Sequence, residues 1–261
     1  MSYPAIDASF RDFEADLSRA RRLLEFIIQF HAFASTNPPE DSVASWPSAQ
    51  SLLDLSKPLR TDLPILSGAI LLYLAGRFEF FVRQTVEAAT DYLVEAAETY
   101  EQLPDPVRRY LHNRSLDVAR DPSKFRLTEL EAFDILTKLV EREKPGSEEL
   151  QVDSWLISYT DSNMRPDVLD DVLKRIGLAD FWTEVGKQTE VKLLFENNSD
   201  GMCKQEARKR LSDIMNERND IAHPTGNIQF SSAEEILQKG EFLRLLGGLL
   251  KSHVILHLRT K

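Results

Sequence analysis

Arg218, Asn219 and His223 form the strongest candidate for a reactive group in this chain. They stand in the stretch NERNDIAHPTG, residues 216–226, where a strongly helical run meets a proline. Histidine exchanges a proton near neutral pH, and the planar guanidinium of arginine can hold a phosphate through parallel hydrogen bonds. The asparagine amide can orient either of these groups. The three residue types together predict a site that moves protons beside a bound phosphate.

Helical spacing places Arg218 on the apolar side of a predicted helix over residues 203–222. At about 100° per residue, the arginine falls in the middle of one narrow apolar face. That face consists of Ala207, Leu211, Ile214, Met215 and Ala222. A core-facing arginine is costly unless it is paired or lines a cavity or an interface. A buried salt bridge or a snorkelling stem is therefore an equal alternative to a functional role for Arg218.

Pro224 determines which way the side chain of His223 can turn. In an unbroken helix the histidine would lie about 140° around the axis from Arg218, so the two side chains could not meet. Proline disfavours helical geometry at the residue before it, so we expect the helix to end near Ala222 or His223. The imidazole can then turn toward the arginine. The proline permits this pairing but does not require it.

Composition restricts the class of protein. The chain has 261 residues, of which 42% are hydrophobic and 9% aromatic, enough for a substantial core. Glycine is scarce at 10 residues, and the abundance of Ala, Leu, Glu and Arg favours helices. A net charge of −10 argues against a globally basic nucleic-acid binder but allows a small local basic site. The single cysteine, Cys203, excludes an internal disulfide and fits a reducing cytoplasm.

Helical periodicity predicts the elements that must position the candidate site. The predicted helices cover residues 7–34, 63–101, 105–119, 127–143, 166–176, 179–195, 203–222 and 232–258. A polar, proline-containing connector follows the first helix and includes a short helical turn at SLLDL. The later segment QVDSWLISY is predicted to be extended or irregular. We place a boundary near residue 60, between an N-terminal helix with its connector (1–60) and a helical domain (61–261).

Local signals predict where several helices begin and end. Pro166 is suited to the first turn of a helix, and Gly177 can terminate that helix. Ser231 and Glu234 have the spacing of a capping box at the start of the last helix. These signals predict both ends of the helix at 166–176 and the start of the final helix.

The long helix near the middle of the chain is predicted to be buried. Its apolar run 63–76 is shorter than the roughly 20 residues that a membrane-spanning helix needs. Gly68 and Gly76 within it each cost about 1 kcal/mol relative to alanine, so they predict close approach of another backbone. We therefore expect a core helix and no membrane association.

Three segments together resemble one known family. ILSGAILLYLAGRFEFFVRQTVE, NMRPDVLDDVLKRIGL and RLSDIMNERNDIAHPTG are similar to the RiboL-PSP/MAE-type branch of the HEPN superfamily, over roughly residues 60–258. Many members are metal-independent ribonucleases with the signature R-x(4–6)-H, which here corresponds to Arg218 and His223. Asn219 is among the polar residues that the family favours after the arginine. The pattern alone is weak. The resemblance is stronger because the histidine stands at the end of a helix and one more long helix follows it.

The resemblance implies an all-α, HEPN-type helical bundle with an N-terminal helical extension. It implies a cytoplasmic endoribonuclease of a bacterial toxin or antiphage defence system, without metal or other cofactor. Its substrate would be RNA, such as tRNA or mRNA, and two motifs of a homodimer would share one cleft. An antitoxin or a defence-system protein is the expected partner. A non-catalytic HEPN module that binds a nucleotide or a partner protein is the alternative function, and a helical scaffold is the third.

The resemblance also assigns roles to individual residues. Arg218, Asn219 and His223 are then the catalytic residues. Glu79, with the basic residue Arg83 four positions later in RFEFFVRQ, has the spacing of a supporting pair in several HEPN families. An ordinary i,i+4 ion pair remains the stronger interpretation of these two residues.

Two basic residues precede the motif on its own helix. Lys204 and Arg208 are candidates for guiding the RNA backbone toward the cleft. A solvated basic face is the more common explanation of such residues. His253 and His257 have the i,i+4 spacing of a helical metal pair, but no third ligand stands nearby in the sequence, so we predict no metal site.

Overall fold

The computed structural model describes residues 3–35, 47–144, 150–224 and 229–260. Within these ranges all regular structure is helical and no strand occurs, which confirms the predicted all-α class. The chain divides into two compact units, each assembled from segments distant in sequence. Unit 1 contains Met1–Arg11, Glu79–Ser212 and Leu246–Lys261, and unit 2 contains Asp12–Phe78 and Asp213–Leu245. The predicted division near residue 60 stays a prediction.

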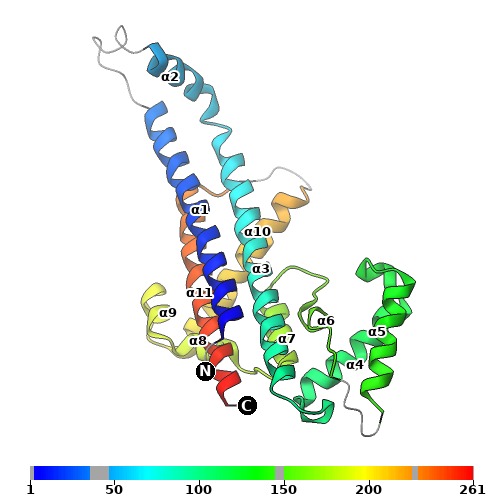
Figure 1. The fold of residues 1–261 in the computed structure, drawn as a ribbon. Coiled ribbons are helices and arrows are strands. Elements are labelled where there is room, and N and C mark those ends of the chain that lie inside the picture. The colour runs from blue at the N-terminus through cyan, green and yellow to red at the C-terminus, as the bar shows by residue number, and fades with distance from the viewer. Residues whose placement is uncertain (1–2, 36–46, 145–149, 225–228, 261) are drawn as a thin grey trace. The chain divides into compact units, whose positions relative to one another are not determined.

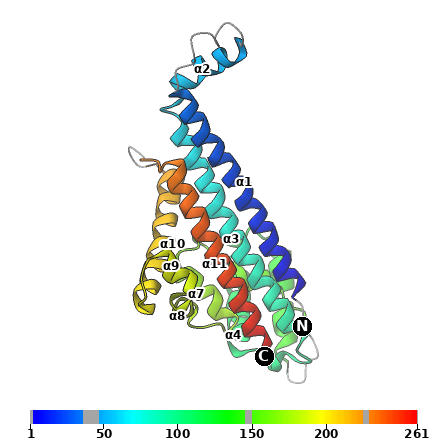
Figure 2. The ribbon, with the colours of Figure 1, turned by 90° about the vertical axis from the view of Figure 1, so that its left-hand side faces the viewer.

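Four long helices each contribute a part to both units. They are α1 (Pro4–Ala34), α3 (Leu63–Glu95), α10 (Asp200–Ala222) and α11 (Ala233–Arg259). Within unit 2, the segments of α1, α3 and α11 lie side by side in both views (Figures 1 and 2). The predicted helices at 7–34, 203–222 and 232–258 are confirmed, with ends shifted by at most a few residues.

A fifth helix of unit 2, α2 (Pro47–Leu59), extends what the sequence indicated only as a short turn at SLLDL. Pro58 stands in its last turn and has no N–H to donate to the carbonyl of Asp54. The part of the predicted connector at residues 36–46 lies outside the described residues.

Unit 1 contains the shorter helices. They are η1 (Tyr100–Gln102), α4 (Asp105–Arg120), η2 (Pro122–Phe125), α5 (Glu129–Arg142), α6 (Trp155–Ser158), α7 (Pro166–Arg175), α8 (Phe181–Lys187) and α9 (Thr189–Leu194). Two predicted helices were too long. The helix predicted to reach residue 101 stops at Glu95, before η1, and residues 179–195 form two helices because Gln188 between them is extended. The segment QVDSWLISY contains the one-turn helix α6.

Of the local signals at helix ends, Pro166 and Gly177 were correct and the capping box was wrong. Helix α7 begins at Pro166, and Gly177 follows its end with a φ of 82°, a left-handed conformation that glycine adopts readily. The capping box of α11 is one residue later than predicted. The backbone N–H of Ser232 donates to Glu235, and the N–H of Glu235 donates to the Ser232 hydroxyl at 3.2 Å.

The predicted close backbone contacts of the two glycines in α3 were wrong. A Cβ on Gly68 would lie 2.5 Å from Cδ1 of Phe230, so the close neighbour of Gly68 is a side chain. A Cβ on Gly76 would meet nothing within 4 Å, and nothing in the structure explains that glycine. Gly68 therefore makes room for an aromatic ring within unit 2.

Helix α3 is less buried than its sequence indicated. Leu71 and Leu74 are buried, whereas Ile65 and Leu66 are each 54% exposed. By length and composition alone α3 could also cross a membrane, since its most apolar window has a mean hydropathy of 1.6, with 44% of that window buried. A core helix of a soluble protein meets the same criteria of length and composition.

Asp16 of α1 joins α1 to α3 inside unit 2. Its carboxylate is 6% exposed, accepts a hydrogen bond from the Tyr73 hydroxyl at 2.6 Å, and pairs with Arg77 and Arg19. Burial favours the neutral acid, but the hydrogen bond from Tyr73 and the positive charge of Arg77 outweigh burial. The pKa of Asp16 therefore lies below its ordinary value.

In unit 1, Arg175 of α7 holds the one-turn helix α6 in place. Its side chain is 7% exposed and donates to the carbonyl oxygens of Ile157 at 2.8 Å and Tyr159 at 2.7 Å. Its guanidinium carbon lies 4.1 Å from the centre of the Tyr110 ring of α4, and Asp171 neutralises its charge. This buried arginine thus connects α4, α6 and α7.

Candidate functional site

Helix α10 ends where the sequence predicted. Its last residue is Ala222, and the backbone N–H of His223 donates to the carbonyl of Asn219 at 2.8 Å. The side chains of His223 and Pro224 are both exposed. The imidazole therefore stands at the end of the helix and is accessible to solvent.

Arg218 lies on the same side of α10 as four buried apolar residues. These are Ala207, Leu211, Ile214 and Met215. Arg218 itself is half-buried, and its Nη1 donates to Oδ1 of Asn219 at 3.3 Å. Across the described ranges Arg218 forms no ion pair, so the buried salt bridge considered from the sequence is absent there. Its remaining N–H groups can bind an anionic ligand.

The motif lies at the end of α10, where the sequence predicted it. Within the described part of the chain, no hydrogen bond joins the side chains of Arg218 and His223. The half-buried guanidinium of Arg218 lies near the end of α10, and the exposed imidazole of His223 stands on the residue that follows the helix. Their direct pairing stays a prediction.

Contacts with α11 and α3 hold the end of α10 in unit 2. Glu217, next to Arg218, forms an ion pair with Lys239 of α11, whose Nζ also donates to the Ser231 hydroxyl at 2.6 Å. Ile221, inside the motif, reaches to 3.4 Å from the position of a Cβ on Gly68. These positioning residues are not predictable from the sequence, because no spacing rule connects residues so far apart in the chain.

Glu79 and Arg83 form the expected ion pair on α3, in unit 1. The Arg83 Nη2 lies 2.6 Å from Glu79 and donates to Thr160, to its hydroxyl at 2.7 Å and its carbonyl at 3.2 Å. Arg83 therefore helps to fix the chain that follows α6. The supporting role of Glu79 and Arg83 in a reaction stays a prediction.

Lys204 and Arg208, also in unit 1, are engaged with neighbouring side chains. The Lys204 ammonium donates to the Thr183 hydroxyl at 2.9 Å. Arg208 pairs with Asp167 and with Asp170, the latter at 3.3 Å. Through these contacts both cations bind neighbouring helices within unit 1. That Lys204 and Arg208 bind RNA stays a prediction.

The two histidines near the C-terminus each contact a backbone carbonyl. Nδ1 of His253 donates to Leu249 at 2.8 Å, and Nε2 of His257 donates to Ile176 at 3.0 Å. The described residues contain no group of three or more His, Cys, Asp or Glu side chains arranged to hold a metal ion.

Most of the chain matches a known protein family. The family model described as RiboL-PSP-HEPN matches residues 16–254. The matched range begins inside α1 and ends inside α11, so it includes most of both compact units and part of the segment before residue 60. No curated protein and no solved structure matches the chain significantly.

Proposed function

Because the chain belongs to the RiboL-PSP-HEPN family, we propose that it is a metal-independent endoribonuclease. The main support for this proposal is the end of α10, where an exposed His223 stands five positions after a half-buried Arg218. Arg218 has no ion-pair partner in the described ranges. In the family resemblance, these positions and Asn219 are the catalytic ones. The geometry supports proton transfer and phosphate binding at one helix end.

The proposed reaction needs no metal ion. The 2′ oxygen of the ribose attacks the adjacent phosphorus, and the bond from phosphorus to the 5′ oxygen breaks. An imidazole takes the proton of the 2′ hydroxyl, and an acid gives a proton to the leaving 5′ oxygen. Arg218 stabilises the negative charge of the phosphorane, and Asn219 orients the guanidinium. The products carry a 2′,3′-cyclic phosphate and a 5′ hydroxyl.

A homodimer completes the proposed site. One imidazole does not serve well as both base and acid in the same displacement, and each chain supplies one His223. Two copies that face one cleft supply both groups. We place this enzyme in the cytoplasm, as a bacterial toxin or antiphage effector that an antitoxin or defence-system protein controls.

The test compares RNA cleavage by the wild type and two histidine variants in EDTA. The substrates are total tRNA and an unstructured single-stranded RNA. We expect cleavage by the wild type, a loss of at least about a hundredfold in His223→Ala, and cyclic phosphate ends on the products. His31→Ala is the matched control, because His31 is an exposed histidine in the last turn of α1 and also belongs to unit 2.

Two outcomes contradict the proposal. Cleavage that EDTA abolishes, or that His223→Ala retains, assigns the activity to other groups. A folded dimer that cleaves neither RNA but binds a nucleotide or a partner protein supports the alternative, a non-catalytic HEPN module.

A further inference from the structure

A cavity of about 390 Å³ lies between α1 and α11 in unit 2. Its floor is apolar and consists of Leu17, Leu24, Leu74, Ile236 and Leu237. Two small residues, Ala20 of α1 and Gly240 of α11, leave the space open. Small-molecule sites of this size combine an apolar lining with a small number of polar or charged groups.

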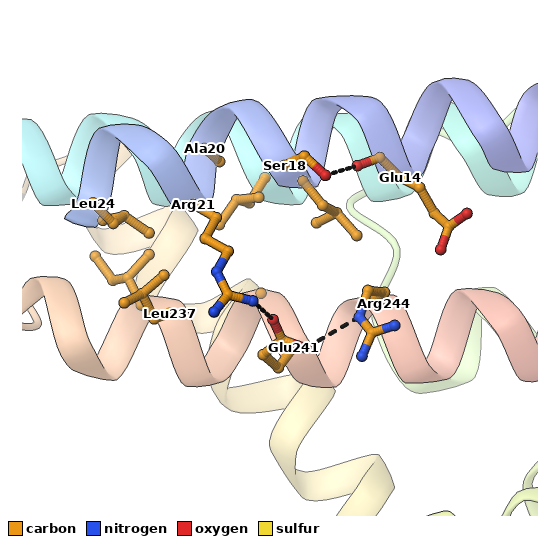
Figure 3. A pocket seen from close by; sticks show the side chains of 12 residues that line it. Glu14, Ser18, Ala20, Arg21, Leu24, Leu237, Glu241 and Arg244 are labelled. Carbon is orange, nitrogen blue, oxygen red and sulfur yellow. Dashed lines mark hydrogen bonds and ion pairs between the residues drawn. The ribbon is translucent and has the colours of Figure 1, made fainter. Parts of the chain in front are cut away.

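Charged side chains surround the mouth of this cavity (Figure 3). Arg21 reaches from α1 to Glu241 of α11 at 3.1 Å and also binds Glu25 at 2.8 Å. Among the described residues, Arg244 bonds through its Nε alone, which donates to Glu241 at 3.1 Å. Arg21 and Glu241 are therefore each already engaged in two charged contacts within the protein.

Two groups at the same end of the cavity remain available. The half-buried carboxylate of Glu14 forms no hydrogen bond or ion pair with any described residue, although its backbone carbonyl accepts from Ser18. The Nη groups of Arg244 are likewise not engaged within the described ranges. Figure 3 shows Glu14 reaching from α1 and Arg244 from α11 at one end of the cavity, without a bond between them.

We propose that this cavity binds a free α-amino acid with an aliphatic or aromatic side chain. The ammonium group of the ligand pairs with Glu14, and its carboxylate receives a forked hydrogen bond from Arg244. The side chain lies on the leucines and the isoleucine of the floor. A simple anion would leave Glu14 unpaired, and a simple amine would leave Arg244 unpaired, so the zwitterion fits both ends.

Isothermal titration of the full-length protein tests this site with four probes. L-leucine contains all three recognised parts, whereas isocaproate lacks the amine, isoamylamine lacks the carboxylate, and glycine lacks the side chain. We expect leucine to bind at least about tenfold more tightly than each of the other three, because each lacks one contact. The affinity for leucine should fall about tenfold in Glu14→Gln and in Arg244→Gln.

A cavity-filling variant with a matched control completes the test. Gly240→Leu places a side chain at the cavity wall, where a Cβ would lie 3.7 Å from Leu74, and should abolish leucine binding. Gly76→Leu makes the same change on α3 at a position with nothing within 4 Å, and should leave binding intact. The proposal is overturned if no heat is seen with leucine, if isoamylamine or glycine equals leucine, or if Glu14→Gln binds like the wild type.

Discussion

Lys239 of α11 and Glu217 of α10 form an ion pair in which the two side chains are only 14% and 20% exposed. Lys239→Met should lower the free energy of unfolding by about 3 kcal/mol, because it leaves a mostly buried carboxylate without its cation. Urea denaturation measures this loss. Lys57→Met is the matched control, since Lys57 is 58% exposed and pairs with Asp54 only at 3.9 Å. An equal loss in both variants would show that burial of the pair is unimportant.

Replacing Gly68 or Gly76 of α3 with alanine should have opposite effects on the stability of the protein. Gly68→Ala should destabilise the protein, because the new Cβ would lie 2.5 Å from Phe230 and the ring would have to move. Gly76→Ala should stabilise it by about 0.5–1 kcal/mol, because the helix gains propensity and nothing lies near the new methyl group. Thermal unfolding of the two variants side by side gives the signs. A stabilising Gly68→Ala would contradict the close contact with Phe230.

Arg218→Lys tests whether the planar guanidinium matters to the proposed nuclease. Lysine keeps the positive charge but cannot form two parallel hydrogen bonds to a phosphate, so the cleavage rate should fall about a hundredfold. Because Arg218 forms no ion pair in the described ranges, stability should change by less than about 0.5 kcal/mol. Arg22→Lys, at an exposed arginine of α1, should keep full activity. Loss of stability without loss of activity in Arg218→Lys would support the helical-scaffold interpretation.

The ionisation of Asp16 should make the stability of the protein vary with pH in the acidic range. Because the native pKa of Asp16 lies below its ordinary value, the carboxylate stabilises the fold above about pH 4 and loses this effect as the pH falls through the native pKa. Asp16→Asn should therefore destabilise the protein near neutral pH, and its difference from the wild type should shrink below about pH 4. Urea midpoints measured across this range give the comparison. A difference that does not vary with pH would contradict the role of the charge.

Local sequence signals predicted much of the fold. Apolar periodicity located the long helices, Pro166 and Gly177 marked α7, and Pro224 placed the end of α10 next to His223. These features depend on the backbone preferences of neighbouring residues, which the sequence contains directly. The capping box of α11 was shifted by one residue, because Ser231 and Ser232 fit the same local pattern.

The contacts around the candidate site could not be read from spacing. Pairing of Glu217 with Lys239 and the place of Phe230 against Gly68 depend on which helices become neighbours in three dimensions. The exposure of Ile65 shows the same limit, since hydropathy ranks a residue as apolar without indicating whether another element covers it. The geometry between Arg218 and His223 likewise depends on side-chain orientation beyond the end of the helix.

The position of Arg175 implies an order of events during folding. A one-turn helix such as α6 is too short to be stable alone, since forming the first turn of a helix is unfavourable. The carbonyl groups of Ile157 and Tyr159 at its end are bound by Arg175 of α7, which stacks on Tyr110 of α4. Helix α6 therefore forms only after α4 and α7 have docked. Its amide hydrogens should exchange with solvent whenever that docking is lost, well before α4 itself unwinds.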